Sequence, residues 1–96
     1  MTLAEDQTWC VYILHTSDGK LYTGITNNMP ARWKKHINKT GAKFFRGRRP
    51  IAIVYQEPDH SRSTASRREY AIKQFSKPQK QCLIIKHYGP HLPALT

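Results

Sequence analysis

Cysteine is scarce in this sequence, and the two that occur, Cys10 and Cys82, lie far apart and form no CxxC pair. This spacing excludes a disulfide framework and a cysteine-based zinc site. The five histidines form no HExxH motif that would place two ligands on one helix face. We therefore expect no structural metal centre.

Acidic residues are also few. The 96 residues contain six Asp and Glu against sixteen Lys and Arg, which gives a formal net charge of +10. On so small a surface this excess creates a potential of several kT and attracts polyanions. No run approaches the roughly 18 apolar residues of a membrane-spanning helix, and residues 1–7 lack the features of a secretory signal. We expect a cytoplasmic protein, nucleoid-associated if it binds DNA, that meets DNA or RNA and no membrane.

Two segments near the start of the chain predict a β-hairpin. Residues 9–15 and 21–26 are rich in β-branched and aromatic residues, and a turn signal separates them. The first segment is apolar at nearly every position, which indicates a central strand covered on both faces.

The register of this hairpin decides whether two tyrosines share a site. A two-residue loop, Asp18-Gly19, would point Tyr12 and Tyr22 to opposite faces of the sheet. A three-residue loop with Gly19 left-handed would instead pair Tyr12 with Gly24. In that register the tyrosines converge, and Gly24 would leave an open floor for a phosphate.

The first helix is expected to begin at Asn27 or Asn28 as cap, with Pro30 at its first position, and to run to about residue 39. Within it, Trp33 and Ile37 are expected to face the core, while Arg32 and His36 form a polar stripe towards solvent. Hydrophobic spacing and turn residues then predict a strand over residues 51–57 and helices over 62–75 and 79–87, with Pro78 between the helices.

These elements predict one α/β (α+β) domain over residues 9–87. It has a three-stranded antiparallel sheet flanked by helices in the order β-β-α-β-α-α. A disordered tail over residues 1–8 and a C-terminal tail over 88–96 are expected on either side.

Short motifs occur along the chain in a characteristic order: Cys10-Val11-Tyr12, Leu21 to Thr26, Arg32 to His36, Gly41 to Lys43, and Arg68-Glu69. Each motif is weak alone, but their order and spacing together are specific. Over roughly residues 9–85 the sequence resembles the GIY-YIG nucleases, most closely their small standalone bacterial members. The first motif lacks its leading glycine, and after Asn38 the chain has no counterpart of the late asparagine of longer members.

The resemblance implies phosphodiester hydrolysis assisted by one divalent ion, Mg²⁺ or Mn²⁺. It implies an endonuclease that acts on DNA with low sequence specificity, in repair or processing. The alternative is a non-catalytic module that binds DNA or RNA and keeps the fold. The positions that match the family's functional residues are Tyr12, Tyr22, Arg32, His36 and Glu69, with Glu69 as metal ligand.

Each of these assignments is consistent with elementary chemistry, and each has an alternative interpretation. Glu69 is the one acidic residue within a predicted helix, and an i,i+4 pair with Lys73 carries equal weight. A guanidinium such as that of Arg32 suits a phosphate clamp because it is planar and permanently charged, although it could also be an ordinary solvated cation. His36 could relay a proton or lie on the surface at the helix end. A phenol with a pKa near 10 needs a nearby cation to act as a base, and each tyrosine could equally be a core aromatic.

Residues 40–50 are predicted to form a basic surface loop whose charges follow a phosphate backbone while a ring stacks on a base. The residues expected to bind nucleic acid are Lys34, Lys35, Lys43, Arg46, Arg48 and Arg49.

Overall fold

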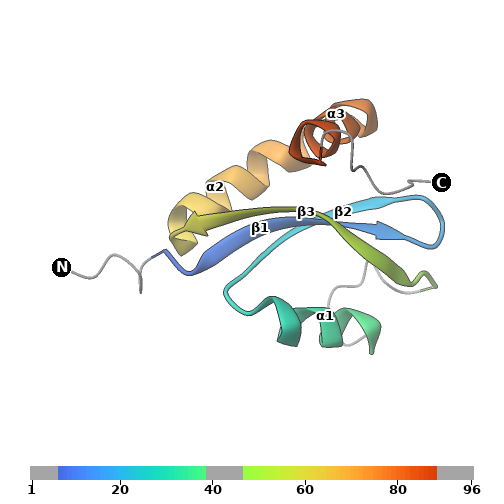
Figure 1. The fold of residues 1–96 in the computed structure, drawn as a ribbon, viewed down its shortest axis with the longest axis horizontal. Helices are drawn as coiled ribbons and strands as arrows, with labels where there is room; N and C mark the ends of the chain where they lie inside the picture. Colours follow the sequence, from blue (N-terminus) through green and yellow to red (C-terminus); the bar gives the residue numbers. More distant parts are fainter. Residues whose placement is uncertain (1–6, 39–46, 89–96) are drawn as a thin grey trace.

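A computed structural model describes residues 7–38 and 47–88 of the chain and confirms the predicted element order (Figure 1). A central strand lies between two partners in the sheet order β2-β1-β3, and both pairings are antiparallel. The predicted basic loop lies mostly outside the described residues, as do the two predicted tails. The elements are β1 (Trp9–Thr16), β2 (Leu21–Thr26), α1 (Met29–Ile37), β3 (Pro50–His60), α2 (Arg62–Lys73) and α3 (Lys77–Tyr88).

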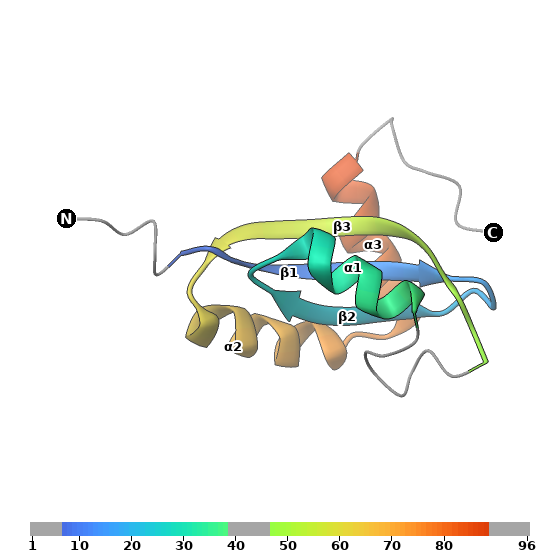
Figure 2. The same ribbon diagram turned by 90° about the horizontal axis from the view of Figure 1, so that it is seen from below.

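The sheet is the middle of three layers. Helix α1 covers one face, and α2 and α3 cover the other (Figure 1). Seen from the α1 side, α2 lies along the side of the sheet that carries β2 (Figure 2). Residues 11–14 of β1 are 0% exposed because both faces of this strand are covered. Alternate side chains therefore enter two cores: Val11 and Ile13 pack towards α2 and α3, and Tyr12 and Leu14 towards α1.

The hairpin adopts the register of the three-residue loop. Tyr12 pairs with Gly24, and Leu14 pairs with Tyr22. Gly19 has a φ of 81°, the left-handed conformation that this loop requires and that glycine adopts without steric cost. Tyr12 and Tyr22 therefore lie on the same face of the sheet, under α1.

Strand β3 is longer than predicted, because neither Pro58 nor Asp59 ends it. Trp9 pairs with His60 and Val11 pairs with Glu57, so β3 contains one more residue than β1 between these two pairs. Such a bulge leaves a residue out of the ladder and accommodates proline on an edge strand. Asp59 takes the strained position, with a φ of 66°.

Both C-terminal helices begin with side-chain caps. Ser61 accepts a hydrogen bond from the backbone N–H of Thr64, and the Thr64 hydroxyl accepts one from that of Ser61, which completes a capping box. Helix α3 begins before Pro78, which was expected to separate the helices. Proline is tolerated there because the first-turn N–H groups have no partner within the helix.

The prediction of which α1 residues face solvent was wrong for two of them. His36 is 0% exposed, whereas Ile37 is 49% exposed. Met29 and Trp33 pack against the Tyr12–Leu14 core, and His36 continues their row one turn later. The helix thus turns a histidine inward, towards the tyrosines.

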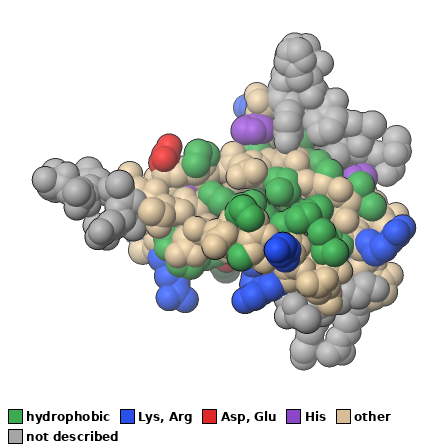
Figure 3. Space-filling model, turned by 60° about the horizontal axis from the view of Figure 1, so that its bottom comes forward, with side chains coloured by type: hydrophobic (Ala, Val, Ile, Leu, Met, Phe, Trp, Pro, Cys, Tyr) green, Lys and Arg blue, Asp and Glu red, His purple; other side chains and the backbone are tan. Residues whose placement is uncertain are grey.

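The side of the molecule that carries α1 shows hydrophobic side chains gathered near its centre (Figure 3). Met29, Trp33 and Ile53 line a groove there. Among the described helices, none has the length and apolar character needed to cross a membrane.

Candidate active site

Tyr12 is the centre of the candidate site. Its side chain is 0% exposed and lies across Gly24 on the neighbouring strand. A Cβ atom at position 24 would lie 2.5 Å from the Tyr12 hydroxyl oxygen and 2.6 Å from Cζ, far inside van der Waals contact. Gly24 therefore makes room for the ring of Tyr12. The expectation of an open floor for a phosphate at this glycine was wrong.

The Tyr12 hydroxyl joins two residues of α1. It lies 2.8 Å from His36 Nε2, and Arg32 Nε donates to it at 3.4 Å. The ring of Tyr22 completes the cluster, with its centroid 6.2 Å from that of Tyr12 and 5.3 Å from that of His36. Four of the five predicted catalytic residues are thus brought together between β1, β2 and α1.

Burial fixes the protonation states of Tyr12 and His36. Desolvation raises the pKa of Tyr12 to about 12, and the hydrogen bond from Arg32 offsets only part of this effect. Burial and then the charge of Arg32 lower the pKa of His36 to about 4. Both groups are therefore neutral at pH 7, and the hydrogen bond between the Tyr12 hydroxyl and His36 Nε2 joins two uncharged groups.

Arg32 is the cation of this cluster. The first turn of α1 is held by Asn28, whose side chain accepts a hydrogen bond from the backbone N–H of Ala31 at 3.2 Å. The Tyr12 hydroxyl raises the pKa of Arg32 above its ordinary value, and Tyr22 contributes in the same direction. A guanidinium has five N–H donors, so its contacts with the tyrosines leave donors for phosphate oxygens.

Glu69 comes from α2, on the other side of the sheet. Its negative charge is one of the causes that raise the pKa of Tyr12, which places the carboxylate within electrostatic reach of the cluster. The pair with Lys73 also forms, at 3.2 Å, with the two side chains 23% and 50% exposed. An i,i+4 pair of this exposure is worth only about 0.3–0.5 kcal/mol. Lys73 therefore leaves Glu69 able to exchange partners.

A second ion pair anchors α2 to the sheet beside Glu69. Arg68 donates from Nε to both carboxylate oxygens of Glu57, each at 3.1 Å. Tyr55 and His60 also contact this carboxylate, at 2.5 and 2.7 Å. Hydrogen bonds from these partners outweigh burial and lower the pKa of Glu57. The sequence did not reveal this network, because its members come together only when α2 packs against β3.

The described carboxylates determine which ligands the protein offers to the expected metal ion. Within residues 7–38 and 47–88, no group of three or more His, Cys, Asp or Glu side chains is arranged to hold an ion. Mg²⁺ keeps several of its waters and is commonly bound through one or two carboxylates together with substrate phosphate. Glu69 is a partly exposed carboxylate of this kind. The donor set fits one hard divalent ion that is completed by water and substrate.

The residues expected to bind nucleic acid fall on different surfaces. Lys34 and Lys35 are exposed on α1. Arg48 pairs with Asp18 of the hairpin loop at 2.9 Å, and the backbone of Arg49 bonds to Ser17. Lys43 and Arg46 lie outside the described residues.

Comparisons with known proteins agree with this architecture. The family model of the GIY-YIG catalytic domain matches residues 8–81. A UPF0213 protein of Photorhabdus laumondii is 47% identical over 83 residues, which are 86% of this chain and 79% of that protein. The UPF0213 protein YhbQ of Escherichia coli K12 is 41% identical over 81 residues, 84% of this chain and 81% of that protein.

A solved structure gives the same result. The solution NMR structure of a UPF0213 protein from Bacillus halodurans has a TM-score of 0.57 and 40% sequence identity to this chain. The match covers 86% of this chain and 88% of that one.

Proposed function

The chain belongs to the GIY-YIG family, and from this we propose that it is a divalent-metal-dependent endonuclease that hydrolyses phosphodiester bonds of DNA with low sequence specificity. The observation that carries the proposal is the grouping of Arg32 with Tyr12, Tyr22 and His36, within electrostatic reach of Glu69. Hydrolysis of a phosphodiester requires a cation that stabilises the charge on the phosphoryl oxygens, and Arg32, held by Tyr12, can supply it. The biological role proposed with it is DNA repair or processing.

Hydrolysis joins a water oxygen to phosphorus and breaks the bond from phosphorus to one sugar oxygen. The attacking water loses a proton, and the leaving oxygen gains one. Arg32 would bind the phosphoryl oxygens, where negative charge grows in the transition state. Glu69 would hold the divalent ion, which when bound polarises the phosphate and lowers the pKa of water.

Tyr12 and His36 have a positioning role in this scheme. With pKa values of about 12 and about 4, moving the proton from Tyr12 to His36 costs roughly 11 kcal/mol in the free protein. That cost argues against Tyr12 as the base in its free state. The fully buried Tyr12 instead holds Arg32 through its hydroxyl, and His36 orients that hydroxyl. Tyr22 is only half-buried, so it is the phenol that meets substrate.

Nicking of supercoiled plasmid in Mg²⁺ or in chelator tests the proposal. Glu69→Gln removes the ligand charge, and we expect nicking to fall at least about 100-fold. Asp59→Asn is the matched control, because Asp59 is an exposed carboxylate with a φ of 66°, a conformation that asparagine tolerates. The proposal fails if the protein shows no metal-dependent nicking, or if Glu69→Gln nicks as well as Asp59→Asn. Binding without nicking would instead support the non-catalytic alternative, and a competition titration would decide whether DNA or RNA is bound.

A further inference from the structure

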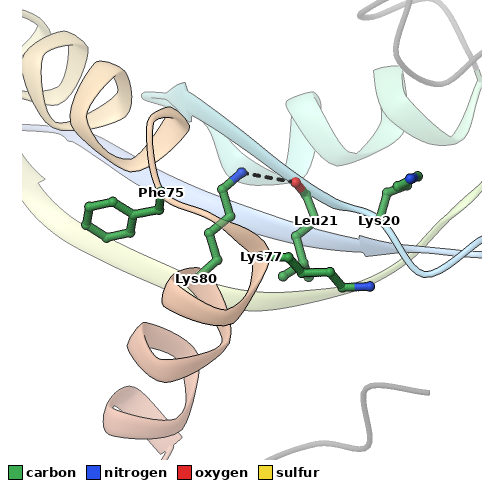
Figure 4. Close-up of a pocket in the computed structure, with 5 residues that line it drawn as sticks. All are labelled: Lys20, Leu21, Phe75, Lys77 and Lys80. Carbon is green, nitrogen blue, oxygen red and sulfur yellow. Dashed lines mark hydrogen bonds between the residues drawn. The ribbon is translucent and has the colours of Figure 1, made fainter.

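Three lysines from distant parts of the chain line one pocket. Its volume is about 210 Å³, and its walls come from the hairpin, from the start of α3 and from the segment that joins α2 to α3 (Figure 4). The residues that line it are Lys20, Leu21, Phe75, Lys77 and Lys80.

Two of these lysines are held in place by the backbone of the hairpin. Lys77 donates from Nζ to the carbonyl of Gly19 at 2.6 Å. Lys80 donates to the carbonyl of Leu21 at 3.3 Å (Figure 4). An ammonium has three donors, so each of the two keeps donors for a ligand. Unlike the ammonium groups of freely moving surface lysines, these two are already ordered in the folded protein. Binding a ligand therefore costs less side-chain entropy.

No carboxylate of the described residues forms an ion pair with any of the three lysines. Three of the described carboxylates have other partners: Asp18 pairs with Arg48, Glu57 with Arg68, and Glu69 with Lys73. Burial and then the charge of Lys73 lower the pKa of Lys80. Like charges that the fold gathers and leaves uncompensated are stabilised when an anion binds among them.

The pocket connects with the candidate active site. Lys73 pairs with Glu69 on one side and is close enough to Lys80 on the other for its charge to act there. Helix α2 lies along the β2 side of the sheet (Figure 2), and Lys77 and Lys80 at the start of α3 contact the hairpin. Positively charged side chains therefore extend from Lys73, the partner of Glu69, to the lysines at the hairpin.

We infer that this pocket binds a backbone phosphate of the DNA strand, away from the phosphate that is cleaved, and that the strand follows the β2 side of the domain between the two sites. The inference rests on the proposed function for its substrate class. Leu21 and Phe75 give the pocket an apolar wall, which suits the sugar next to a bound phosphate. The lysines supply the charge-assisted hydrogen bonds.

The apolar groove on the α1 side offers a polyanion less than the lysine pocket does. Hydrophobic side chains occupy its centre (Figure 3), and the groove there is lined by Met29, Pro30, Trp33, Ile53 and Gln56, without a cation. Lys34 and Lys35 are exposed on α1, and neither lines this groove. Neutralising lysines of the pocket should therefore weaken DNA binding more than neutralising Lys34 and Lys35 does.

The test compares Lys20→Gln/Lys77→Gln with Lys34→Gln/Lys35→Gln. Each double variant removes two charges at exposed positions. Binding of the full chain to a labelled DNA duplex is measured by fluorescence anisotropy in chelator, at several salt concentrations, and thermal unfolding checks that both variants are folded. For Lys20→Gln/Lys77→Gln we expect about tenfold weaker binding and a log–log salt slope smaller by about 0.9, since the pocket holds one phosphate and each phosphate contact contributes about 0.9. For Lys34→Gln/Lys35→Gln we expect a loss below about threefold.

An equal or larger loss with Lys34→Gln/Lys35→Gln, or unchanged binding by Lys20→Gln/Lys77→Gln, overturns the inference. The chelator keeps this result separate from hydrolysis. If the unmodified protein binds DNA and the pocket variant is weakened, yet Mg²⁺ produces no nicking, the proposed function fails while the pocket stands. If the protein nicks plasmid and the pocket variant binds normally, the inference about the pocket alone fails.

Discussion

Replacement of Gly24 by alanine tests the packing on which the candidate site depends. The backbone of Gly24 does not lie in the left-handed region, since Gly19 and Gly47 are the described glycines with positive φ, so alanine is conformationally acceptable there. The new Cβ, however, would lie 2.5 Å from the Tyr12 hydroxyl and 2.6 Å from its Cζ. The ring must move, and its 2.8 Å hydrogen bond to His36 must break.

The magnitude follows from two contributions. Overpacking a close-packed interior costs about 1–3 kcal/mol, and leaving a buried hydrogen-bonding group without its partner costs about 1–3 kcal/mol. Relaxation of the ring partly satisfies both, so we expect Gly24→Ala to lower the free energy of unfolding by about 2–4 kcal/mol. For a domain of this size that corresponds to a fall in Tm of roughly 10–20 °C.

A double-mutant cycle identifies the cause. Tyr12→Leu removes the hydroxyl and the ring atoms that the new methyl group would meet. In that background Gly24→Ala should cost nothing, or stabilise by about 0.5 kcal/mol because alanine replaces a strand glycine. Urea unfolding followed by tryptophan fluorescence measures all four corners, since Trp33 packs against the same core. Equal costs in the two backgrounds, within about 0.5 kcal/mol, would refute the packing argument.

Two further predictions concern charge. The pKa of His36 is about 4 in the folded protein against 6.5 unfolded, so its contribution to stability is complete above pH 6.5 and is lost as the pH falls to about 4, by roughly 3 kcal/mol. The difference in unfolding free energy between the unmodified protein and His36→Gln should narrow over this range, and a constant difference would exclude the depressed pKa. Lys73→Ala should change stability by less than about 0.5 kcal/mol, yet lower the Mg²⁺ midpoint of plasmid nicking about twofold to threefold because Glu69 loses a competitor. Arg67→Ala is the charge-matched control, and an equal shift in both would argue against competition.

The sequence was sufficient to predict the hairpin but left its register open between a two-residue and a three-residue loop. The structure has the three-residue loop, in which Gly19 is left-handed and Tyr12 lies opposite Gly24. The length of β3 was less accessible. Pro58 and Asp59 are typical strand terminators, and only pairing with β1 shows that a bulge absorbs them.

The inward position of His36 could not be predicted from hydrophobic spacing. That pattern assigns a polar residue to solvent, whereas the Tyr12 hydroxyl, 24 residues earlier, gives the imidazole a buried partner. The lysine pocket had no sequence signal for the same reason. Lys77 meets the carbonyl of Gly19 from 58 residues away, and such contacts exist only once the helices have packed on the sheet.

The charges around Tyr12 and His36 indicate how substrate changes the site. Glu69 is one cause of the raised pKa of Tyr12, so neutralising that carboxylate lowers this pKa. Arg32 is one cause of the depressed pKa of His36, so a phosphate that offsets the guanidinium charge raises that pKa. The pKa values of Tyr12 and His36 thus approach each other when ligands neutralise the charges of Glu69 and Arg32. Burial is the largest cause for both groups and remains, so Tyr12 and His36 stay neutral and hydrogen-bonded to each other throughout. In the proposed mechanism the pair acts by fixing Arg32, and the proton that hydrolysis releases would leave by way of Tyr22 or solvent.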